Sequence, residues 1–340
     1  MMDAALQAAL LTLEPERAHA VALQLLATAG ATEPGRRALR FLYGPAQERG
    51  VELAGLRFPN RVGLAAGYDK DARAWKAFAA LGCGHVEVGT VTPRPQPGNP
   101  HPRVFRLRDQ RAVINRMGFP SQGARVVRAR LDADRPYGTV LGVNIGKNKD
   151  TPLEEASRDY VELVEVFGDV ADYLTVNVSS PNTPQLRELQ RGPALRALLA
   201  EVVRARDAEV ARRGRALPVF VKLAPDLDDA DLDDALGAVD DSGLDGIVAT
   251  NTTISREGVT GRLAQETGGL SGAPLTQRAL TLIRTIRARA RADLPLIGVG
   301  GIMTTEDARA RLDAGADLVQ VYTGLVYRGA GFVRAVAEET

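Results

Sequence analysis

Cysteine and histidine are scarce in this chain of 340 residues, which contains one cysteine, Cys83, and three histidines. A single cysteine excludes a disulfide within the chain, and so few Cys and His side chains disfavour a zinc site. The sequence also lacks a cluster of Asp, Glu and His residues suited to a divalent metal. We therefore expect no metal site.

Strong net charge and long apolar runs are lacking as well. The net charge is +1, which argues against binding nucleic acid or anionic lipid through bulk electrostatics. No apolar run approaches the roughly 20 residues of a membrane-spanning helix, and no charged-then-apolar leader opens the chain. The composition predicts a globular protein that is located inside the cell.

Residues 1–45 are predicted to be helical. Pro15 suits the start of a helix, and Gly30 suits its end. Between them, apolar residues recur at the helical spacing of three and four, namely Ala18, Val21, Ala22, Leu25, Leu26 and Ala29. Two interpretations remain open: a helical hairpin packed on the main domain, which the pattern alone favours, and an apolar module that contacts a membrane or a lipophilic ligand.

From residue 46 onward, short apolar runs alternate with longer amphipathic stretches. The runs cover 62–66, 86–89, 140–145, 173–178, 219–223, 246–250, 296–299 and 318–322. This alternation is typical of parallel strands joined by crossover helices, and the number of units fits a closed barrel. An open doubly wound sheet is the main alternative, but its G-x-G-x-x-G motif does not follow the first run. The prediction is an α/β fold: a (β/α)8 TIM barrel of residues 46–340 with a small N-terminal helical extension of residues 1–45.

Polar residues and glycines gather directly after the apolar runs. They are Gly67, Asp69, Lys70, Thr90, Asn144, Lys147, Ser180, Asn182, Lys222, Thr250, Asn251, Thr252, Gly300, Gly301, Tyr322, Thr323 and Gly324. In a barrel these positions converge on the face formed by the carboxyl ends of the strands, where barrel enzymes keep their active sites. The segment 92–119 does not fit the repeat. It is predicted to be a long loop rich in proline, glycine and arginine, and loops of this length are usually functional.

The residue types in this cluster indicate an anionic ligand and an organic cofactor. Lys70, Lys147 and Lys222 make the predicted site electropositive, and Asp69 is nearly its only carboxylate. Asparagine side chains can bind the amide and carboxylate edges of a planar ligand, and a serine between them could act as a nucleophile or as a proton acceptor. An ordinary turn uses the same residue types. The glycines after the last two runs suit a phosphate, so a phosphate-bearing cofactor fits better than metal chemistry.

Several long motifs in chain order resemble those of dihydroorotate dehydrogenases, and the resemblance covers essentially the whole chain. The motifs are AAGYDKDA (65–72), VEVGTVTPRPQPGNPHPRVFRL (86–107), INRMGF (114–119), NIGKNK (144–149), NVSSPNTPQLR (177–187), VKLAPD (221–226), TNTT (250–253), GGLSGAPL (268–275) and GVGGI (298–302). A serine within NVSSPNTP and a helical N-terminal extension resemble class 2 of this family, which is membrane-associated and reduces quinones. Class 1 enzymes use a cysteine as base, and Cys83 lies in the wrong segment for that role.

The resemblance implies residue roles, each at the matching position of this sequence. FMN would lie over the barrel mouth and contact Ala66, Gly67, Thr90, Asn144, Asn177, Lys222, Thr250, Gly272, Gly301, Tyr322 and Thr323. Dihydroorotate would contact Lys70, Asn115, Arg116, Met117, Gly118, Phe119, Asn177, Asn182, Asn251 and Thr252. Ser180 would be the catalytic base, Thr183 would help its proton to leave, and Lys222 would stabilise the reduced flavin. His19 and Arg106 would line the path of the quinone. Tyr68 is a mild departure, because the family usually has Leu or Phe there.

The implied activity is oxidation of (S)-dihydroorotate to orotate in de novo pyrimidine (UMP) biosynthesis, with FMN as hydride acceptor and a membrane quinone as final electron acceptor. The implied location is the cytoplasmic side of the cell membrane, with peripheral contact through residues 1–45. A monomer is compatible with the sequence, and no nucleic acid partner is expected. The alternatives are a soluble class 1-like enzyme that uses fumarate or NAD, a non-catalytic FMN-binding barrel, and another FMN-dependent barrel dehydrogenase.

Overall fold

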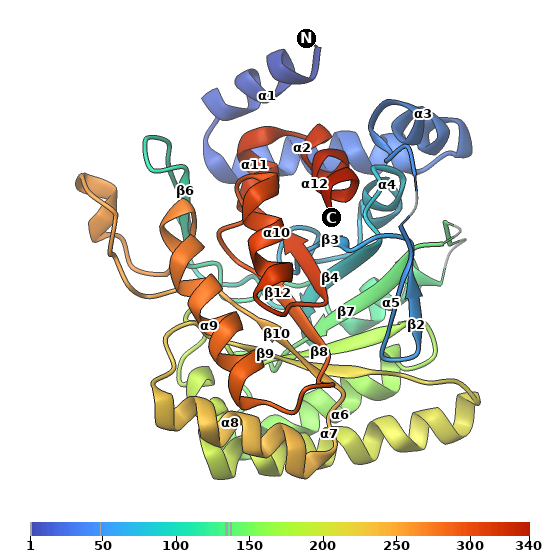
Figure 1. Ribbon diagram of the computed structural model, residues 1–340, viewed down its shortest axis with the longest axis vertical. Coiled ribbons are helices and arrows are strands. Elements are labelled where there is room, and N and C mark those ends of the chain that lie inside the picture. Colours follow the sequence, from blue (N-terminus) through green and yellow to red (C-terminus); the bar gives the residue numbers. More distant parts are fainter. Residues whose placement is uncertain (1, 48, 133–134, 137) are drawn as a thin grey trace.

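A closed barrel of eight parallel strands forms the centre of the protein (Figure 1). A computed structural model describes residues 2–47, 49–132, 135–136 and 138–340. In order around the barrel, the strands are β3 (Val62–Leu64), β4 (His85–Val91), β7 (Val140–Ile145), β8 (Tyr173–Asn177), β9 (Val219–Leu223), β10 (Gly246–Ala249), β12 (Leu296–Val299) and β13 (Leu318–Val321). The predicted (β/α)8 barrel is therefore confirmed. The predicted segments 1–45 and 46–340 include a few positions that lie outside the described residues, namely 1, 48, 133–134 and 137.

Each predicted run overlaps one barrel strand, and the runs 140–145, 219–223 and 296–299 have the bounds of β7, β9 and β12. The other runs differ from their strands by one or two residues at an end. Burial continues past the ends of the strands, as at Ala65 and Val178, which are 2% and 0% exposed. The apolar pattern follows burial, so it cannot mark the point at which pairing ends.

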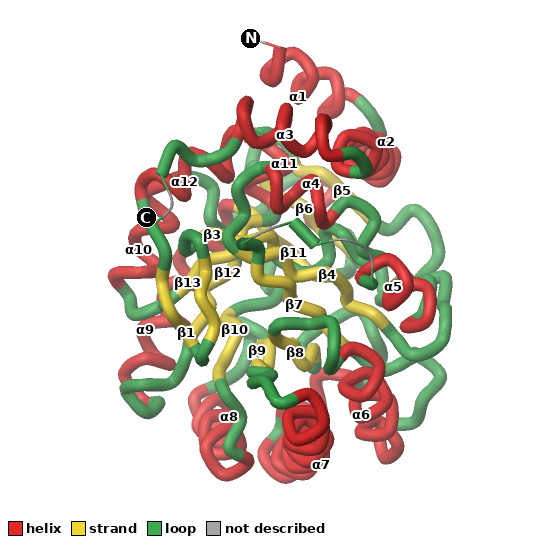
Figure 2. Tube along the Cα trace, turned by 90° about the vertical axis from the view of Figure 1, so that its right-hand side faces the viewer, coloured by secondary structure: helices red, strands yellow, loops and turns green. Residues whose placement is uncertain are grey.

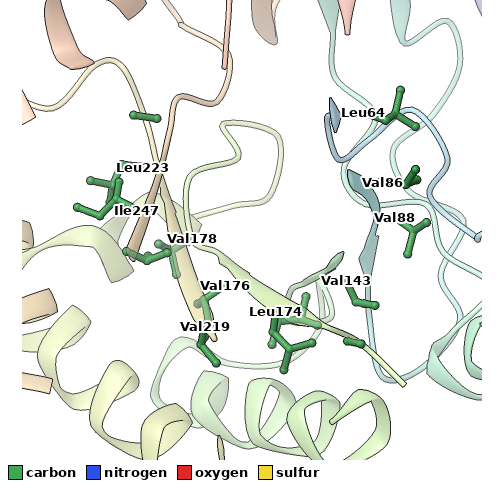
Figure 3. Close-up of a cluster of buried hydrophobic side chains, with 14 of the residues drawn as sticks. Leu64, Val86, Val88, Val143, Leu174, Val176, Val178, Val219, Leu223 and Ile247 are labelled. Atoms are coloured by element: carbon green, nitrogen blue, oxygen red, sulfur yellow. The ribbon is translucent and has the colours of Figure 1, made fainter. Parts of the chain in front are cut away.

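Helices surround the barrel (Figure 2). They are α4 (Trp75–Ala80), α5 (Ala124–Leu131), α6 (Ala156–Phe167), α7 (Gly192–Arg213), α8 (Asp229–Ser242), α9 (Thr276–Arg289), α10 (Thr305–Asp313), α11 (Thr323–Arg328) and α12 (Gly331–Glu339). The outward side chains of the strands pack against these helices and form the main core, as Val88, Val176 and Ile247 do in Figure 3. Because parallel strands are covered on both faces, they read as near-continuous apolar runs.

A short hairpin, β1 (Val51–Leu53) and β2 (Leu56–Phe58), precedes the first barrel strand. Its apolar side chains pack with inward-facing residues of the barrel such as Tyr173 and Phe220, and Phe58 is 1% exposed. The hairpin was not predicted, because three-residue strands are too short to show a clear alternation.

The segment 92–119 is not the structureless loop that was predicted. It contains β5 (Val104–Leu107) and β6 (Ala112–Asn115), which pair with each other and with β11 (Gly269–Gly272) in a separate antiparallel sheet. The partner strand β11 lies about 150 residues farther along the chain, and its register with β6 is set by tertiary structure. This small sheet stands beside the barrel and carries Asn115 at its end.

The N-terminal helices α1 (Met2–Thr12), α2 (Pro15–Gly30) and α3 (Glu33–Tyr43) lie at one end of the molecule (Figures 1 and 2). The helix predicted from Pro15 to Gly30 is confirmed, and the Glu14 carboxylate caps it by accepting the backbone N–H groups of Glu16 and Arg17. These helices pack against α4, α11, α12 and β5. Among the described residues, no helix is both long and apolar enough to cross a membrane.

Candidate active site

A polar cavity opens at the carboxyl ends of the barrel strands. Most of the predicted site residues line it, namely Ala66, Gly67, Lys70, Thr90, Asn115, Met117, Gly118, Phe119, Asn177, Ser180, Asn182, Lys222, Thr250, Asn251, Thr252, Gly301, Tyr322 and Thr323. Asn115, Met117, Gly118 and Phe119 come from the end of β6 and the loop after it. The others come from the carboxyl ends of the barrel strands, all of which contribute except β7. The clusters that are scattered along the sequence therefore form a single site.

Buried amide and hydroxyl groups bond to one another along the floor of this cavity. The Thr90 hydroxyl donates to Asn144 Oδ1 at 2.5 Å, and Asn177 Nδ2 donates to Thr90 Oγ1 at 2.8 Å and to Asn144 Oδ1 at 3.1 Å. Asn144 does not line the cavity itself; it lies behind Thr90 and Asn177. This network fixes the direction of each amide, which matters because an amide can bind in two orientations.

Glu87 lies inside the barrel, beneath the floor network, and is fully buried. Its carboxylate accepts hydrogen bonds from Asn144 Nδ2 at 2.8 Å, from the Tyr173 hydroxyl at 3.1 Å and from Gln320 Nε2 at 2.7 Å. In all three hydrogen bonds the carboxylate oxygens are the acceptors. Sequence reasoning missed Glu87, although a charged residue within the otherwise apolar run VEVG was a usable signal.

Lys222 brings a buried ammonium group to the cavity. Burial lowers the pKa of Lys222, and the negative charge of Glu87 opposes that effect. The side chain is only 5% exposed. A positive charge held in this way can stabilise negative charge that develops on a ligand in the cavity.

Lys70 lies on the opposite wall, where its Nζ donates to the Gly67 carbonyl oxygen at 2.6 Å and lies 3.4 Å from Met117 Sδ. Burial, together with the charge of Arg103, lowers the pKa of Lys70 to about 8. This lysine is therefore charged at neutral pH and close to losing its charge under mildly alkaline conditions.

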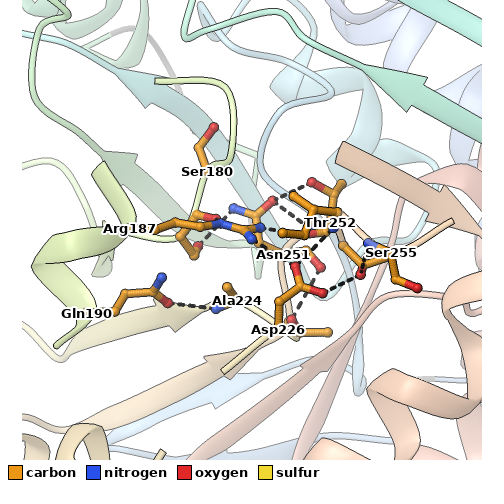
Figure 4. A network of polar contacts seen from close by, with 12 residues as sticks. Ser180, Arg187, Gln190, Ala224, Asp226, Asn251, Thr252 and Ser255 are labelled. Atoms are coloured by element: carbon orange, nitrogen blue, oxygen red, sulfur yellow. Dashed lines mark hydrogen bonds and ion pairs between the residues drawn. The ribbon is translucent and has the colours of Figure 1, made fainter. Parts of the chain in front are cut away.

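Ser180 projects into the cavity from the loop after β8, and its hydroxyl oxygen accepts the Asn182 N–H at 3.2 Å. Figure 4 shows the serine side chain directed away from the neighbouring polar network. Thr183 is buried and does not line the cavity; within the described chain its hydroxyl has no hydrogen-bond partner. The predicted part of Thr183 in proton transfer remains a prediction.

Arg187 holds the serine loop against two neighbouring loops (Figure 4). It donates to the carbonyl oxygens of Ser179 and Thr252, both at 2.9 Å, and forms an ion pair with Asp226 at 2.8 Å. Asn251 adds a second link, from its Nδ2 to Ser179 Oγ at 2.9 Å. Arg187 has no predicted role, because nothing local in the sequence reveals its three partners.

Two loops bring backbone close to the cavity at the carboxyl ends of β12 and β13. Gly300 and Gly301 have φ angles of +104° and +66°, and a Cβ on Gly301 would lie 2.4 Å from Thr276 Cα. Only glycine fits there, and the exposed peptide groups are suited to a phosphate.

A second, apolar cavity of about 380 Å³ lies between the N-terminal helices and the barrel. His19 and Arg106 both line it. Burial, with a smaller contribution from the charge of Lys70, lowers the pKa of His19 to about 4, so the imidazole is neutral at pH 7. Arg106 donates to the carbonyl oxygens of Leu11 and Leu13 at 2.9 and 3.3 Å. The apolar and polar cavities share four lining residues, which are Asn115, Met117, Ser271 and Tyr322.

Comparison with known proteins agrees with this geometry. The model of the family described as dihydroorotate dehydrogenase matches residues 50–340. The chain belongs to the dihydroorotate dehydrogenase family. A protein named dihydroorotate dehydrogenase (quinone) from Delftia acidovorans is 48% identical over 337 residues, covering 96% of this chain and 95% of the relative. The protein of the same name from Acidithiobacillus ferrooxidans is 50% identical over 335 residues, covering 97% and 92%.

Solved structures of dihydroorotate dehydrogenases have the same fold. The crystal structure of the Eimeria tenella enzyme in complex with ferulenol matches with a TM-score of 0.85 and 39% sequence identity, covering 96% of this chain and 90% of that chain. The ligand-free Eimeria tenella enzyme also matches with a TM-score of 0.85, at 40% identity. The match covers 96% of this chain, so it extends beyond the barrel into the N-terminal segment.

Two residues of the predicted polar cluster after the apolar runs are directed elsewhere. Lys147 was expected to add positive charge, but it does not line the cavity, and its Nζ donates to the carbonyl oxygens of Asn148 and Thr151 at 3.1 and 2.7 Å. Asp69 accepts the backbone N–H groups of Arg73 and Ala74 and stabilises a turn. Neither expectation is correct, because a residue after a strand can face the loop and not the barrel axis.

Arg116 and Gly272 also lie outside the cavity lining. Arg116 forms an ion pair with Glu266 at 2.6 Å, and its guanidinium lies 4.5 Å from the Phe105 ring centroid. Gly272 has a φ of +97° and follows the lining residue Ser271. Their positions are next to the site, and their predicted ligand contacts remain predictions.

Proposed function

We propose that this protein oxidises (S)-dihydroorotate to orotate, with FMN as the hydride acceptor and a membrane quinone as the final electron acceptor, in de novo pyrimidine (UMP) biosynthesis. The observation that carries the proposal is the pair of adjoining cavities. One is polar and contains Ser180 and Lys70, the other is apolar and contains His19, and they share a wall. Such an arrangement suits an enzyme that takes electrons from a polar substrate and passes them to an apolar one.

The residues of the polar cavity fit FMN. Thr90 and Asn177 offer donors and acceptors to the edge of a planar ring, and their bonds to Asn144 fix the direction of these groups. The loop at Gly301 offers backbone to a phosphate. FMN, when bound, supplies the chemistry of accepting a hydride and passing electrons onward. Lys222 would hold a positive charge against the ring, and Glu87 would favour the charged form of that lysine.

The substrate would bind between Lys70 and the asparagine side chains. Asn182 Nδ2 already donates to Asn115 Oδ1 at 3.2 Å, so these amides are placed to recognise the carboxylate and amide edges of dihydroorotate. Ser180 would remove a ring proton, and Lys70 would stabilise the negative charge that develops as the proton leaves. Ser180 would release its own hydroxyl proton through Thr183, whose hydroxyl would accept that proton while passing its own on to solvent.

Residues 1–45 would form the quinone module and the membrane contact, at the cytoplasmic side of the cell membrane. Large apolar side chains are exposed on the N-terminal helices: Leu6 (48%), Val21 (39%), Leu25 (51%), Phe41 (86%) and Leu42 (56%). These residues could enter the interfacial region of a bilayer while the apolar cavity receives the quinone. Residues 46–340 would form the catalytic domain.

Two half-reactions test this function. The purified protein should carry FMN, and dihydroorotate should bleach its visible absorbance without oxygen; a quinone analogue should then restore the colour. Bound FMN that dihydroorotate does not bleach would refute the proposal and favour a binding protein. Reoxidation by fumarate or NAD, but not by the quinone, would favour the soluble class 1-like alternative.

A further inference from the structure

A partly buried ion pair joins helix α2 to the loop that precedes β5, with the arginine side chain 9% exposed and the glutamate side chain 21% exposed. Glu16 lies on α2, and its carboxylate accepts hydrogen bonds from Arg103 Nε at 3.0 and 3.3 Å and from Arg103 Nη2 at 2.8 Å. The Arg103 residue is only 8% exposed. His101 Nδ1 also lies 3.0 Å from the Glu16 carboxylate. This forked contact is the geometry in which arginine binds a carboxylate most strongly.

The other side of the Arg103 guanidinium holds the loop 97–99. Its Nη1 donates to the carbonyl oxygens of Pro97 and Asn99 at 2.7 and 3.0 Å. Between them, Gly98 has a φ of +78°, and a Cβ there would lie 2.4 Å from the Met117 carbonyl oxygen. The loop is therefore packed closely on the segment that lines the polar cavity.

Asn99 continues the connection into the polar cavity. Its Nδ2 donates to the carbonyl oxygens of Asn182 and Arg116 at 2.9 and 3.1 Å, and its backbone N–H donates to the Met117 carbonyl oxygen at 2.8 Å. Its Oδ1 accepts a hydrogen bond from Lys149 at 3.2 Å. Asn182 and Met117 both line the cavity, so Asn99 fixes two of its walls from behind.

We propose that Glu16 and Arg103 are positioning residues for the substrate site, through which helix α2 holds the loops that bind dihydroorotate. The proposal rests on the proposed function and adds to it: the N-terminal extension serves the reductive half-reaction as well as the quinone. Without Glu16, the guanidinium of Arg103 would remain buried without its counter-ion, and the loop 97–99 would lose its anchor. The charges of this pair also act on Lys70. The positive charge of Arg103 lowers the pKa of that lysine, and the negative charge of Glu16 raises it.

Replacing Glu16 by glutamine tests the proposal in the FMN-loaded protein. Orotate affinity is measured by calorimetric titration, and anaerobic flavin reduction is measured against dihydroorotate concentration; neither measurement involves the quinone, whose cavity Glu16 also lines. We expect Glu16→Gln to weaken orotate binding about tenfold, with a smaller change in the limiting rate of flavin reduction. Glu33→Gln is the matched control, because it weakens two ion pairs, with Arg36 and Arg37, that are confined to helix α3, and it should leave orotate affinity unchanged.

A double-mutant cycle measures how far the effects of Glu16 and Arg103 on orotate binding depend on each other. Arg103→Met should weaken orotate binding by a similar factor, and the double variant should be little worse than either single one.

If Glu16→Gln loses FMN, Asn99→Asp tests the same connection from its other end, because it removes the donor to Asn182 and keeps the acceptor for Lys149. Wild-type orotate affinity in Glu16→Gln, or in Asn99→Asp where that variant is needed, would overturn the proposal. Absence of flavin reduction in the wild-type protein would instead refute the proposed function.

Discussion

Ser180 lies among amides and lysines, and no acidic side chain lines the same cavity in the described part of the chain. A general base is typically worth about 10²–10⁴-fold in rate. We therefore expect Ser180→Ala to retain FMN and to reduce it at least about 100-fold more slowly with dihydroorotate. Anaerobic stopped-flow measurement of flavin bleaching checks this prediction.

Two further serine variants serve as controls for that experiment. Ser180→Cys should keep partial activity with a lower pH optimum, because a thiol ionises more readily than a hydroxyl. Ser242→Ala changes a serine at the end of helix α8, where the hydroxyl donates to the Val239 carbonyl oxygen of the same helix, and should behave as wild type. A flavin reduction rate near wild type in Ser180→Ala would exclude the serine as base.

Lys70 gives the reaction a pH dependence whose sign follows from its lowered pKa of about 8. Below this pH the ammonium is charged and attracts the anionic substrate, and above it the charge is lost. We therefore expect kcat/KM for dihydroorotate to fall as the pH rises through about 8, since this parameter reports the free enzyme. Lys70→Met should be less active throughout, without this decline; the same alkaline decline in Lys70→Met would assign it to another group.

At the scale of single elements, helix α3 presents the most exposed large apolar side chains of the N-terminal segment, with Phe41 at 86% and Leu42 at 56%. Each such side chain contributes roughly 1.5–3 kcal/mol when it leaves water. Replacing both by serine should therefore reduce binding to phosphatidylcholine vesicles at least about tenfold, while flavin reduction stays unchanged. Flotation with vesicles measures this binding.

The membrane contact of α3 should be apolar and should therefore persist at high salt. Val126→Ser is a suitable control, because Val126 is an exposed apolar residue (38%) on helix α5, outside the N-terminal segment. Vesicle binding that high salt abolishes, or that the double serine variant retains in full, would contradict an apolar contact through α3.

Elements differed in how well the sequence predicted them. The barrel strands were predicted because each is a run of buried β-branched residues between turns, which is a local signal. The strands β5 and β6 were missed because their partner β11 comes from a distant part of the chain. The same reason explains why Arg187 and Glu87 were not assigned roles, since their partners come from different strands and loops.

At the scale of the whole molecule, the N-terminal helices and the barrel together enclose a space that neither encloses alone. The apolar cavity has walls from α1 and α2 and from barrel residues such as Tyr68 and Leu81. The helices pack on the barrel, as the first interpretation of residues 1–45 expected. The apolar cavity beneath them offers space for a lipophilic ligand, and contact with such a ligand or with a membrane stays a prediction. The polar cavity lies just beyond the shared wall, so the proposed electron donor and acceptor can bind close together on different surfaces.

The sequence by itself determined the barrel, its order of strands and helices, and the place of Ser180, Lys70 and Lys222 at strand ends. These properties follow from local periodicity and from the rule that parallel strands end at one face. Only the tertiary structure decided which of these side chains enter the cavity, as the turning away of Lys147 illustrates. It also brought Glu16 to Arg103, because an ion pair between residues 87 positions apart depends on how helix α2 packs on the barrel and leaves no periodic trace in the sequence.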